Sequence, residues 1–461
     1  MTLPAPRYVA VFDVGKTNAK LAIVDTGDMA ECAVRKSANT VLRDGPYPHF
    51  DMERLWAFFL ASLQELNAQF PVDAISITTH GASGALVKLD GTLALPALDY
   101  EHTGPDELQG AYDAIRPPFS ETFSPRLPIG LNLGAQLYWQ QQRFPEAFAA
   151  ASHMLALPQY WAMRMTGVAA SEATSLGCHT DLWNPAKSCL TTMVDTLGWR
   201  HLFPPLRSAF DALGPLLPAI CAQTGVSPGT PVYCGIHDSN ASLLPHLMAR
   251  TPPFSVVSTG TWVIMLSNGG DLQRLDPSRD TLANSDAFSR PVASARFMGG
   301  REYEILTAGI DDDSQAGLVE VLETPVLLLP SVETGSGPFP RRKAEWLPGK
   351  PAPNLVPAAA SLYLAMMTAT SLSLTGANGP VIVEGPFARN RTYLDMLGVA
   401  TNRKVFAGGS SSTGTSIGAA LLALGPKFSF ALKSEEIAAP EPALAGKLAA
   451  WRDRWLDAVR R

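Results

Sequence analysis

The sequence predicts a mixed α/β protein made of two similar domains with a cleft between them. At 461 residues, the chain is too long for one ordinary hydrophobic core, so two or three domains are expected. Its first third alternates strand-like and helix-like segments, as mixed α/β sheets do. Each half opens with two apolar runs joined by a short polar turn that contains glycine and threonine. This recurrence indicates a duplicated domain.

The composition excludes several classes of protein. Apolar residues make up 46% of the chain and charged residues 17%, which indicates a globular protein rather than a disordered or fibrous one. The net charge of −6 argues against broad electrostatic binding to nucleic acid. Residues 1–7 lack the apolar core of a signal peptide. The sequence has no run of about 18 uninterrupted apolar residues that would suggest a membrane span. With five scattered cysteines and no CxxC pair, we expect reduced thiols and a cytoplasmic protein.

The first hairpin spans residues 9–24 and carries unusual chemistry in its turn. Asp13 ends a buried strand, and a glycine lets backbone N–H groups approach a ligand closely. A carboxylate beside a concave set of donors suits a nucleotide with bound Mg²⁺, although an ordinary hairpin with a polar tip has the same pattern. The donors around Asp13 are Gly15, Thr17, Asn18 and Lys20.

The rest of the first half predicts further elements of an α/β sheet. Apolar residues at helical spacing predict a helix over Asp51–Phe70, capped by Asp51. A buried strand is expected over Val72–Thr79. Two more strands, Ala85–Leu89 and Thr92–Leu98, flank an Asp-Gly turn. Residues 124–228 are predicted to be rich in helix and broken by prolines.

The second half begins near residue 231. A short strand over Pro231–Ile236 leads through a polar turn into a helix, where we expect Ser239 to cap the helix and leave Asp238 free. The double proline Pro252-Pro253 predicts a hinge, and a hairpin follows over Ser255–Leu266.

Toward the C-terminus the expected elements become simpler. Small residues predict a long helix over Ala358–Thr375, followed by a strand over Val381–Glu384 and a helix over Thr392–Ala400. The glycine- and serine-rich run 408–418 leads into an Ala/Leu-rich helix. Residues Met298–Glu302 are expected to form a loop that covers a ligand, or a plain turn.

Four motifs in this order resemble those of the FGGY carbohydrate kinases, members of the actin/hexokinase-like ATPase group. They cover residues 9 to about 424, nearly the whole chain. The resemblance implies two ribonuclease-H-like domains flanking a catalytic cleft, one over 1–247 that binds sugar and one over 248–461 that binds nucleotide. The motifs are Asp13-x-Gly15-x-Thr17-x-x-Lys20 (first phosphate loop), Gly235-x-His237-Asp238 (catalytic aspartate), Ser258-Thr259-Gly260-Thr261-Trp262 (second phosphate loop), and Gly385 with Asn390 followed by Gly408 to Gly418 (adenosine region).

The resemblance implies ATP and Mg²⁺ as cofactors and a role for each motif. Asp238 would be the general base, and Asp13 would hold Mg²⁺ through water. Taken alone, Asp238 is more simply a helix cap, and Lys20 a solvated lysine at a strand edge. Where the family has a second glycine after Gly385, this chain has Pro386, which removes a backbone donor. The residues expected to bind the nucleotide are Asp13, Gly15, Thr17, Asn18, Lys20, Thr259, Gly260, Thr261, Gly385, Asn390 and Gly414.

The sugar is expected at the ends of the strands in the first domain. The second phosphate loop, the His-Asp pair and the segment 84–91 look closest to the rhamnulose and fuculose kinase branch. That likeness implies phosphorylation at C1 of a 6-deoxy ketose such as L-rhamnulose or L-fuculose. The residues expected to bind sugar are His80, Gly81, Asp99, Gln136 and His237, with Asn132 a weaker candidate.

Other functions remain open at this point. The chain could phosphorylate another ketose or polyol, such as xylulose, ribulose or glycerol. It could also be an actin- or chaperone-like ATPase that controls a partner, although a region for binding peptides or forming filaments is not evident. A silent sugar sensor is disfavoured because Asp13 and Asp238 are both intact. We expect a small sugar as the partner, no nucleic acid or membrane, and leave a homodimer open.

Overall fold

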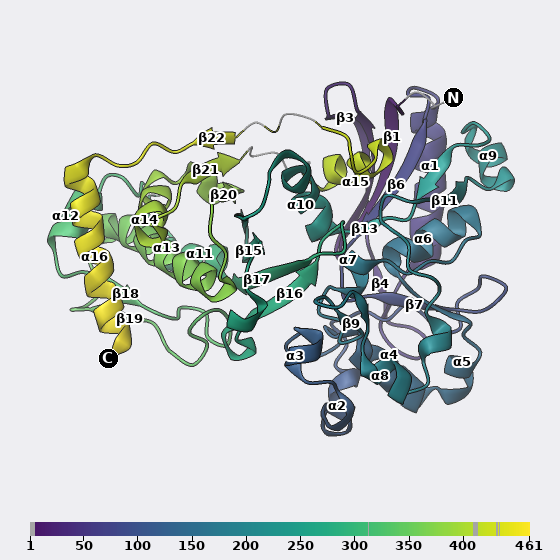
Figure 1. Cartoon of the computed structure of the whole chain (residues 1–461), viewed down its shortest axis with the longest axis horizontal. Coiled ribbons are helices and arrows are strands. Elements are labelled where there is room, and N and C mark those ends of the chain that lie inside the picture. The colour runs from purple at the N-terminus through teal and green to yellow at the C-terminus, as the bar shows by residue number, and fades with distance from the viewer. Residues whose placement is uncertain (1–4, 312, 409–413, 430–431, 433) are drawn as a thin grey trace. The chain divides into compact units, whose positions relative to one another are not determined.

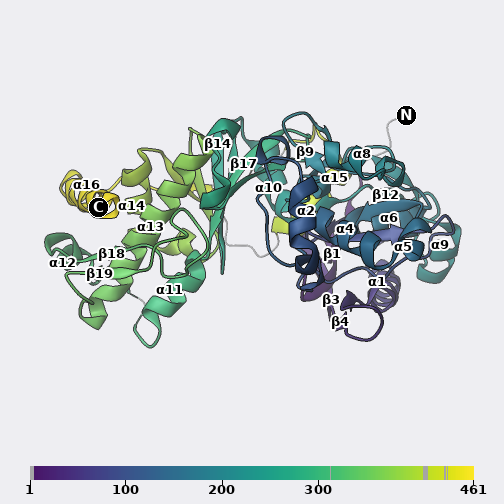
Figure 2. The same cartoon turned by 90° about the horizontal axis from the view of Figure 1, so that it is seen from below.

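A computed structural model describes residues 5–311, 313–408, 414–429, 432 and 434–461. Its contacts divide the chain into two compact units (Figures 1 and 2). Unit 1 comprises residues up to Ala249 with 284–291 and 414–429, and unit 2 comprises the other described residues. The expected domains were continuous in sequence, whereas two segments of the second half pack in unit 1.

The central sheet of unit 1 has the strand order β11-β12-β6-β1-β2-β3, and β13 also pairs with β6. The pairs β1–β2 and β2–β3 are antiparallel, whereas β6 runs parallel to β1, β12 and β13. The predicted hairpin and the strand that follows the first helix are therefore confirmed. The strands are β1 (Tyr8–Val14), β2 (Asn18–Asp25), β3 (Ala30–Ala38), β6 (Ala74–Thr79), β11 (Ala212–Pro215), β12 (Pro231–Tyr233) and β13 (Ile236–His237).

Several helices pack around this sheet. Helix α1 (Met52–Asn67) has the predicted cap, because the side chain of Asp51 accepts a hydrogen bond from the Arg54 N–H. Helix α15 (Gly414–Leu424) packs on β6 and β1, and α10 (Asp238–Ala249) packs against α15. The two helices approach so closely that a Cβ at Gly418 would overlap the carbonyl of Ala241. Glycine at this position therefore permits the packing.

The rest of unit 1 consists of short elements around the sheet. The predicted strand Ala85–Leu89 forms as β7, but the predicted strand Thr92–Leu98 is wrong, since this run has only isolated bridges. Pro96 within the run cannot donate to a ladder, and β7 pairs with β8. The elements are β4 (Val41–Leu42), β5 (His49–Phe50), β7 (Gly84–Val87), α2 (Gln109–Ile115), α3 (Phe119–Thr122), α4 (Leu133–Arg143), α5 (Pro145–Ala149), β8 (His153–Ala156), α6 (Leu157–Thr166), α7 (Ala173–Leu176), β9 (Trp183–Asn184), β10 (Cys189–Leu190), α8 (Thr192–Thr196) and α9 (Pro218–Thr224).

Unit 2 contains a sheet of the order β16-β17-β15-β14-β20-β21-β22. The pairs β14–β15 and β15–β17 are antiparallel, and β20 runs parallel to β14 and β21. The predicted second hairpin and the predicted strand Val381–Glu384 are confirmed. The strands are β14 (Phe254–Thr259), β15 (Val263–Asn268), β16 (Thr281–Ser285), β17 (Pro291–Phe297), β20 (Val381–Glu384), β21 (Val405–Gly408) and β22 (Ser434–Glu436), with β18 (Leu327–Leu329) and β19 (Glu345–Leu347) as a separate pair.

The helices of unit 2 pack around α13 (Val356–Thr375), which is predicted correctly and lies beside α14 (Arg391–Thr401) in Figures 1 and 2. The span Pro353–Thr375 is long and apolar enough to cross a membrane, but 89% of its most apolar window is buried within the protein. It is therefore a core helix. The remaining helices are α11 (Gly299–Thr307), α12 (Leu318–Glu323) and α16 (Pro442–Arg460).

Two details of unit 2 were not foreseen. Helix α11 begins at Gly299, where a loop or turn is expected from the sequence. The C-terminal helix α16 is anchored by two buried tryptophans, because the indole N–H groups of Trp451 and Trp455 donate to the carbonyls of Val326 and Leu328.

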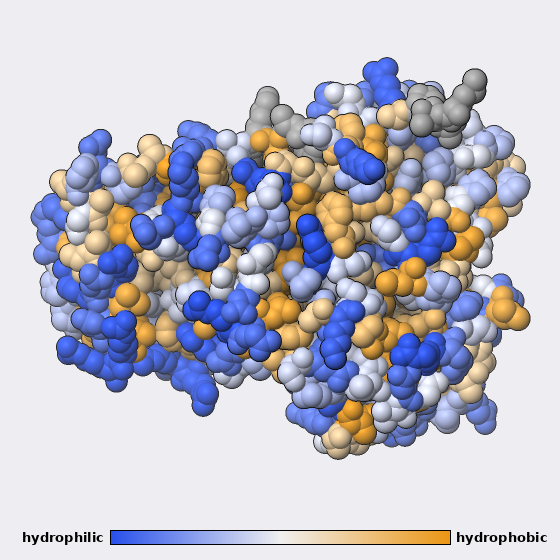
Figure 3. All heavy atoms as spheres, in the orientation of Figure 1, coloured by the Kyte–Doolittle hydropathy of each residue, from blue (hydrophilic) through white to orange (hydrophobic). Residues whose placement is uncertain are grey.

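Apolar residues on the face drawn in Figure 3 are interspersed with hydrophilic ones over both units.

Candidate active site

Asp13 and Lys20 face each other across the first hairpin. They are direct partners in the β1–β2 register, and Lys20 Nζ lies 3.5 Å from Asp13 Oδ2 and 3.0 Å from Glu31 Oε1. Burial raises the pKa of Asp13 to about 6; Lys20 opposes this rise, and the carboxylate of Asp238 adds to it. Two carboxylates thus lie close enough to repel each other electrostatically.

The turn of this hairpin offers exposed donors. The N–H of Gly15 donates to the carbonyl of Asn18 over 2.8 Å and closes the turn. Thr17 and Asn18 are exposed, and the Asn18 amide donates to the Thr17 hydroxyl over 3.1 Å. A pocket of about 460 Å³ opens here, and its lining residues are Asp13, Gly15, Thr17, Asn18, Ala19, Lys20 and Lys36.

Asp238 stands where β13 turns into α10, two strands away from Asp13 in the same sheet. Its side chain is 34% exposed, and its Oδ1 lies 3.2 Å from His237 Nε2. The expected cap by Ser239 is wrong: helix α10 begins at Asp238 itself, and the Ser239 N–H and hydroxyl donate to the Asp238 carboxylate over 2.6 and 3.3 Å. The other carboxylate oxygen of Asp238 has no hydrogen bond within the described residues.

His80 follows β6 and carries an unsatisfied nitrogen. The ring is 7% exposed and lies near the rings of Phe50 and Tyr100. Its Nδ1 contacts the carbonyl of Gly81 at 2.9 Å, while Nε2 has no partner among the described residues. A buried polar atom without a partner is costly, so this nitrogen is suited to a hydroxyl supplied by a ligand.

Lys16 is a residue that the sequence reasoning missed. Its ammonium group bonds the carboxylate of Asp99, lies 3.3 Å from Glu101, and sits over the rings of Phe50 and Tyr100. The predicted sugar residue Asp99 therefore has a cationic partner. The signal was available, because Lys16 lies inside the first phosphate-loop motif.

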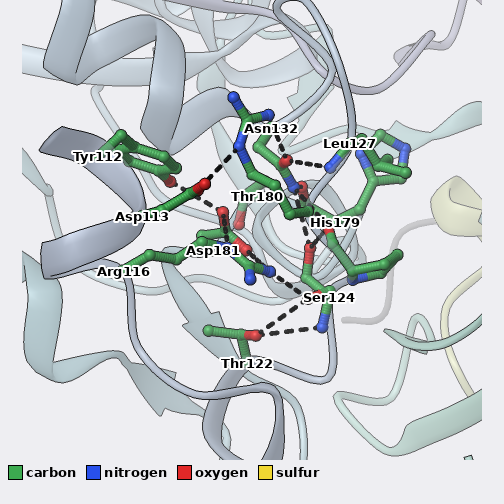
Figure 4. Close-up of polar contacts among 12 residues, drawn as sticks. Tyr112, Asp113, Arg116, Thr122, Ser124, Leu127, Asn132, His179, Thr180 and Asp181 are labelled. Carbon is green, nitrogen blue, oxygen red and sulfur yellow. Dashed lines mark hydrogen bonds and ion pairs between the residues drawn. The ribbon is translucent and has the colours of Figure 1, made fainter. Parts of the chain in front are cut away.

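Two predicted sugar residues instead support the framework. Both amide protons of Gln136 are donated to the carbonyls of Ala82 and Gly130. Asn132 donates to the carbonyl of His179 over 2.9 Å and accepts from the Leu127 N–H over 2.8 Å (Figure 4). These side chains hold the loops that carry the candidate site.

Cys178 was also missed, since it is one of five scattered cysteines with no motif around it. Its Sγ lies 3.4 Å from His237 Nε2. Gly81 makes room for this pair, because a Cβ there would come within 2.6 Å of the sulfur and 2.9 Å of the imidazole. The predicted sugar residues Gly81 and His237 therefore contact each other and Cys178.

The turn of the second hairpin, in unit 2, carries no charge. Gly260 and Thr261 are exposed, and the Gly260 N–H donates to the carbonyl of Trp262 over 3.0 Å. The hydroxyl of Thr259, a residue expected to bind the nucleotide, donates to the carbonyl of Glu384. It also accepts the N–H of Phe387 over 3.1 Å, so it ties β14 to β20.

The predicted adenosine residues are divided between the units. Asn390 caps α14, accepts from the Tyr393 N–H over 2.9 Å and donates to the Ser361 hydroxyl over 2.9 Å. Gly414 begins α15 in unit 1, and residues 409–413 of the predicted run lie outside the described residues. A pocket of about 500 Å³ in unit 2 is lined by Gly260, Thr261, Gly300, Tyr303, Glu304, Asp313, Ser314, Gln315, Pro386, Phe387, Arg389, Asn390 and Arg391.

Comparisons with known proteins identify the family of the chain. A model of the N-terminal domain of the FGGY family of carbohydrate kinases matches residues 8–245, and a model of the FGGY carbohydrate kinase C-terminal domain matches residues 251–431. The crystal structure of a carbohydrate kinase from Novosphingobium aromaticivorans is similar with a TM-score of 0.91 and 36% identity, covering 98% of this chain and 100% of that one.

Curated relatives are more distant. L-fuculokinase of Escherichia coli K12 is 23% identical over 268 residues, or 56% of each chain. A probable L-xylulose kinase of Pasteurella multocida is 23% identical over 288 residues, which cover 58% of this chain and 57% of that protein. The matches thus span little more than half the length of the curated relatives. The predicted fold class, with two actin/hexokinase-like ATPase domains, is confirmed, and the chain belongs to the FGGY family of carbohydrate kinases.

Proposed function

We propose that the protein is an ATP-dependent kinase that transfers the γ-phosphoryl group of ATP to a hydroxyl of a small sugar. One observation carries this proposal: Asp238 presents a partly exposed carboxylate at the start of α10, beside His237 and in the electrostatic field of Asp13. A carboxylate in this position suits an alcohol acceptor, whose proton must be taken up as its oxygen attacks phosphorus.

In the proposed reaction the sugar oxygen forms a bond to the γ-phosphorus as its proton passes to Asp238. The bond from phosphorus to the β–γ bridging oxygen breaks, and ADP carries away the electron pair. The exposed turn donors at Gly15 and Thr17 in unit 1, and at Gly260 and Thr261 in unit 2, are the groups that we assign to the phosphates. The Thr259 hydroxyl already donates to the carbonyl of Glu384, so we do not assign this side chain to the phosphates.

The residues around Asp13 fit Mg²⁺. This ion takes one or two carboxylates and keeps several waters, so a cluster of three acidic or thiol ligands is not required, and the described residues contain none. Burial and Asp238 raise the pKa of Asp13, and a cation reverses that penalty by stabilising the charged form. When bound, Mg²⁺ would neutralise charge on the phosphates, with Asp13 as its protein anchor.

For the sugar we propose a 6-deoxy ketose, phosphorylated at C1, with L-fuculose or L-rhamnulose first. The unpartnered Nε2 of His80 would bind one of its hydroxyls. Both ring nitrogens of the predicted sugar residue His237 already face protein groups, so we assign its imidazole to Asp238 rather than to the sugar. The similarity to L-fuculokinase supports this order, and the similarity to a probable L-xylulose kinase makes L-xylulose the second candidate. A cytoplasmic location, the absence of a nucleic-acid partner and a homodimer remain predictions.

The test is ADP release with MgATP across L-fuculose, L-rhamnulose, L- and D-xylulose, L- and D-ribulose and glycerol. We expect the highest kcat/KM with a 6-deoxy ketose. A preference for another ketose or for glycerol would support the proposed kinase activity but reject the assignment to the rhamnulose and fuculose kinase branch. Release of ADP that no sugar stimulates would contradict the proposed function.

A further inference from the structure

Cys178 lies in a buried loop directly behind the candidate base. The loop connects α7 to β9, and Cys178 is 4% exposed. His237 Nε2 faces two groups at once, since it lies 3.4 Å from Cys178 Sγ and 3.2 Å from Asp238 Oδ1. Sulfur, imidazole and carboxylate therefore form a continuous chain of contacts.

The imidazole is held from its other sides as well. The backbone N–H of His237 donates to the Thr174 hydroxyl over 3.0 Å, and that hydroxyl donates to the buried carboxylate of Glu172 over 2.6 Å. The ring atom Nδ1 lies 3.3 Å from the amide of Asn240. With its backbone and Nδ1 engaged, His237 has only Nε2 left to face the thiol and the base.

A buried ion pair fixes the loop that carries the thiol. The guanidinium of Arg116 makes two bonds to the Asp181 carboxylate, at 2.8 and 2.9 Å, and the Tyr112 hydroxyl donates to the same group (Figure 4). The Asn132 amide holds the carbonyl of His179, next to Cys178 in the chain. The thiol thus sits on a segment that is fixed by the residues directly following it.

We propose that Cys178 is a positioning residue for phosphoryl transfer, which holds the His237 imidazole where it orients the Asp238 carboxylate. The inference rests on the proposed function, since it assumes that Asp238 is the base. It deepens that function by assigning to the reaction a residue that contacts neither sugar nor nucleotide. A buried hydrogen-bonded array of this kind is sensitive to the loss of any member.

Electrostatics supports this geometry. Burial alone would raise the pKa of the Cys178 thiol, but His179 and His237 outweigh it and bring this pKa down to about 5. Burial would lower the pKa of His237, whereas Cys178, Asp238 and Glu172 raise it to about 9. Both shifts favour the thiolate–imidazolium form of the pair. Two further titratable groups face this array. The pKa of His80 is lowered chiefly by burial and also by Lys16 and His237, and burial, with smaller contributions from carboxylates and Cys178, raises the pKa of Tyr100 to about 12.

The experiment compares Cys178→Ala and Cys178→Ser with the wild type, and uses Cys221→Ser as a buried cysteine outside the site. Without the thiolate, His237 loses its proton at lower pH. We expect kcat of Cys178→Ala to be near that of the wild type at about pH 6, where histidine is protonated in both, and about tenfold lower at about pH 8. Serine preserves the hydrogen bond but not the charge, so its defect should be intermediate. Cys221→Ser should match the wild type.

A merely structural role would give a defect that is the same at every pH, and that result would overturn the proposal. An unchanged kcat in Cys178→Ala would also overturn it. A second measurement does not depend on activity. The ultraviolet absorbance of the thiolate should be present at neutral pH, absent in Cys178→Ala, and reduced in His237→Gln, where His179 remains beside the sulfur. If it is absent in the wild type, the inference fails whatever the sugar. If it is present but no sugar stimulates ADP release, the proposed function fails, and with it the positioning role.

Discussion

The two units have the same strand pattern but different chemistry at the ends of the strands. In each, an antiparallel hairpin extends to a third strand, and a parallel strand follows on the other side. In unit 1 the hairpin carries Asp13, Lys16 and Lys20, whereas the corresponding turn of unit 2 is uncharged. A repeated scaffold can therefore divide the work, with charged groups in one copy and backbone donors in the other.

A glycine after the parallel strand shows the same contrast. In unit 1 it is Gly81, next to the side chains of Cys178 and His237, and its φ is not positive. In unit 2 it is Gly385, which has a φ of +83° and lies against the carbonyl of Thr259. Gly81 is bordered by side chains, which can move, whereas Gly385 is bordered by backbone, which is rigid. Substitution by alanine should therefore affect stability differently at the two positions.

The strongest test of the charged copy is Asp238→Asn. The amide cannot accept the hydroxyl proton, so we expect kcat to fall about 10²- to 10⁴-fold while ADP affinity stays within about twofold. Steady-state kinetics and calorimetric titration with ADP measure the two quantities. Asp90→Asn, in an exposed turn, is the matched control and should behave as the wild type. Normal turnover in Asp238→Asn would remove this residue from the mechanism.

Gly385→Ala should be strongly destabilising in the backbone copy. A Cβ there would overlap the Thr259 carbonyl, and alanine is strained at this φ, so we expect a loss of about 2–4 kcal/mol. Urea unfolding measures it. The control is Gly110→Ala in α2, where the Cβ would meet nothing within 4 Å. A loss below that of Gly81→Ala would contradict the contrast between the two glycines.

The charged turn should also make stability depend on pH. Because the pKa of Asp13 is raised from 3.8 to about 6 in the folded state, folding takes up a proton between these values. The destabilisation from Asp13 is thus absent below about pH 4 and complete above about pH 6. Asp13→Asn should be more stable than the wild type by about 1–3 kcal/mol at about pH 8 and equal to it at about pH 4.

The same substitution should lower activity, since it removes the proposed anchor for Mg²⁺. Asp25→Asn is a control in which the change in stability should have the opposite sign. The pKa of Asp25 is lowered in the folded state, chiefly by a hydrogen bond from the Gly27 backbone. Slight burial opposes this shift, and Arg7 adds to it. The stability that this variant loses should be complete above the pKa of the unfolded carboxyl and should disappear as pH falls through the lower pKa of the folded state. Melting temperatures of both variants at about pH 4 and about pH 8 test these predictions. A stability difference between Asp13→Asn and the wild type that does not change with pH would contradict the raised pKa of Asp13.

Gly81→Ala should have a smaller effect on stability, about 1–2 kcal/mol, because the side chains of Cys178 and His237 can shift. Its kcat should nevertheless fall, since that shift moves the imidazole away from Asp238. Adding Cys178→Ala creates space and should recover part of the lost stability but not the rate. Recovery of both would contradict the positioning role of the thiol.

Local patterns made much of the fold predictable. Both hairpins, the capped helix α1 and the core helix α13 follow from periodicity and turn residues close together in the sequence. What no local pattern could predict depends on long-range packing. Residues 414–429 join unit 1 because α15 packs on β6 and β1, contacts that no local pattern encodes.

The candidate site shows the same limit. The motif residues Asp13 and Asp238 could be named because each sits in a recognisable turn. Cys178 has no such context, and only the folded chain brings it to His237. Thr259 and Gln136 carry suitable groups, but their hydrogen bonds to backbone carbonyls become visible only in three dimensions.

The central claim is that His80 in unit 1 serves the sugar and Thr261 in unit 2 serves the nucleotide, and separate titrations of two variants test it most directly. His80→Ala removes the unpartnered nitrogen in unit 1, and Thr261→Val removes the exposed hydroxyl in unit 2. Calorimetry with the preferred sugar alone, and then with ADP alone, should show sugar affinity about tenfold lower in His80→Ala only, and ADP affinity about tenfold lower in Thr261→Val only. If either variant weakens both ligands equally, or weakens the other ligand, the division of labour is contradicted.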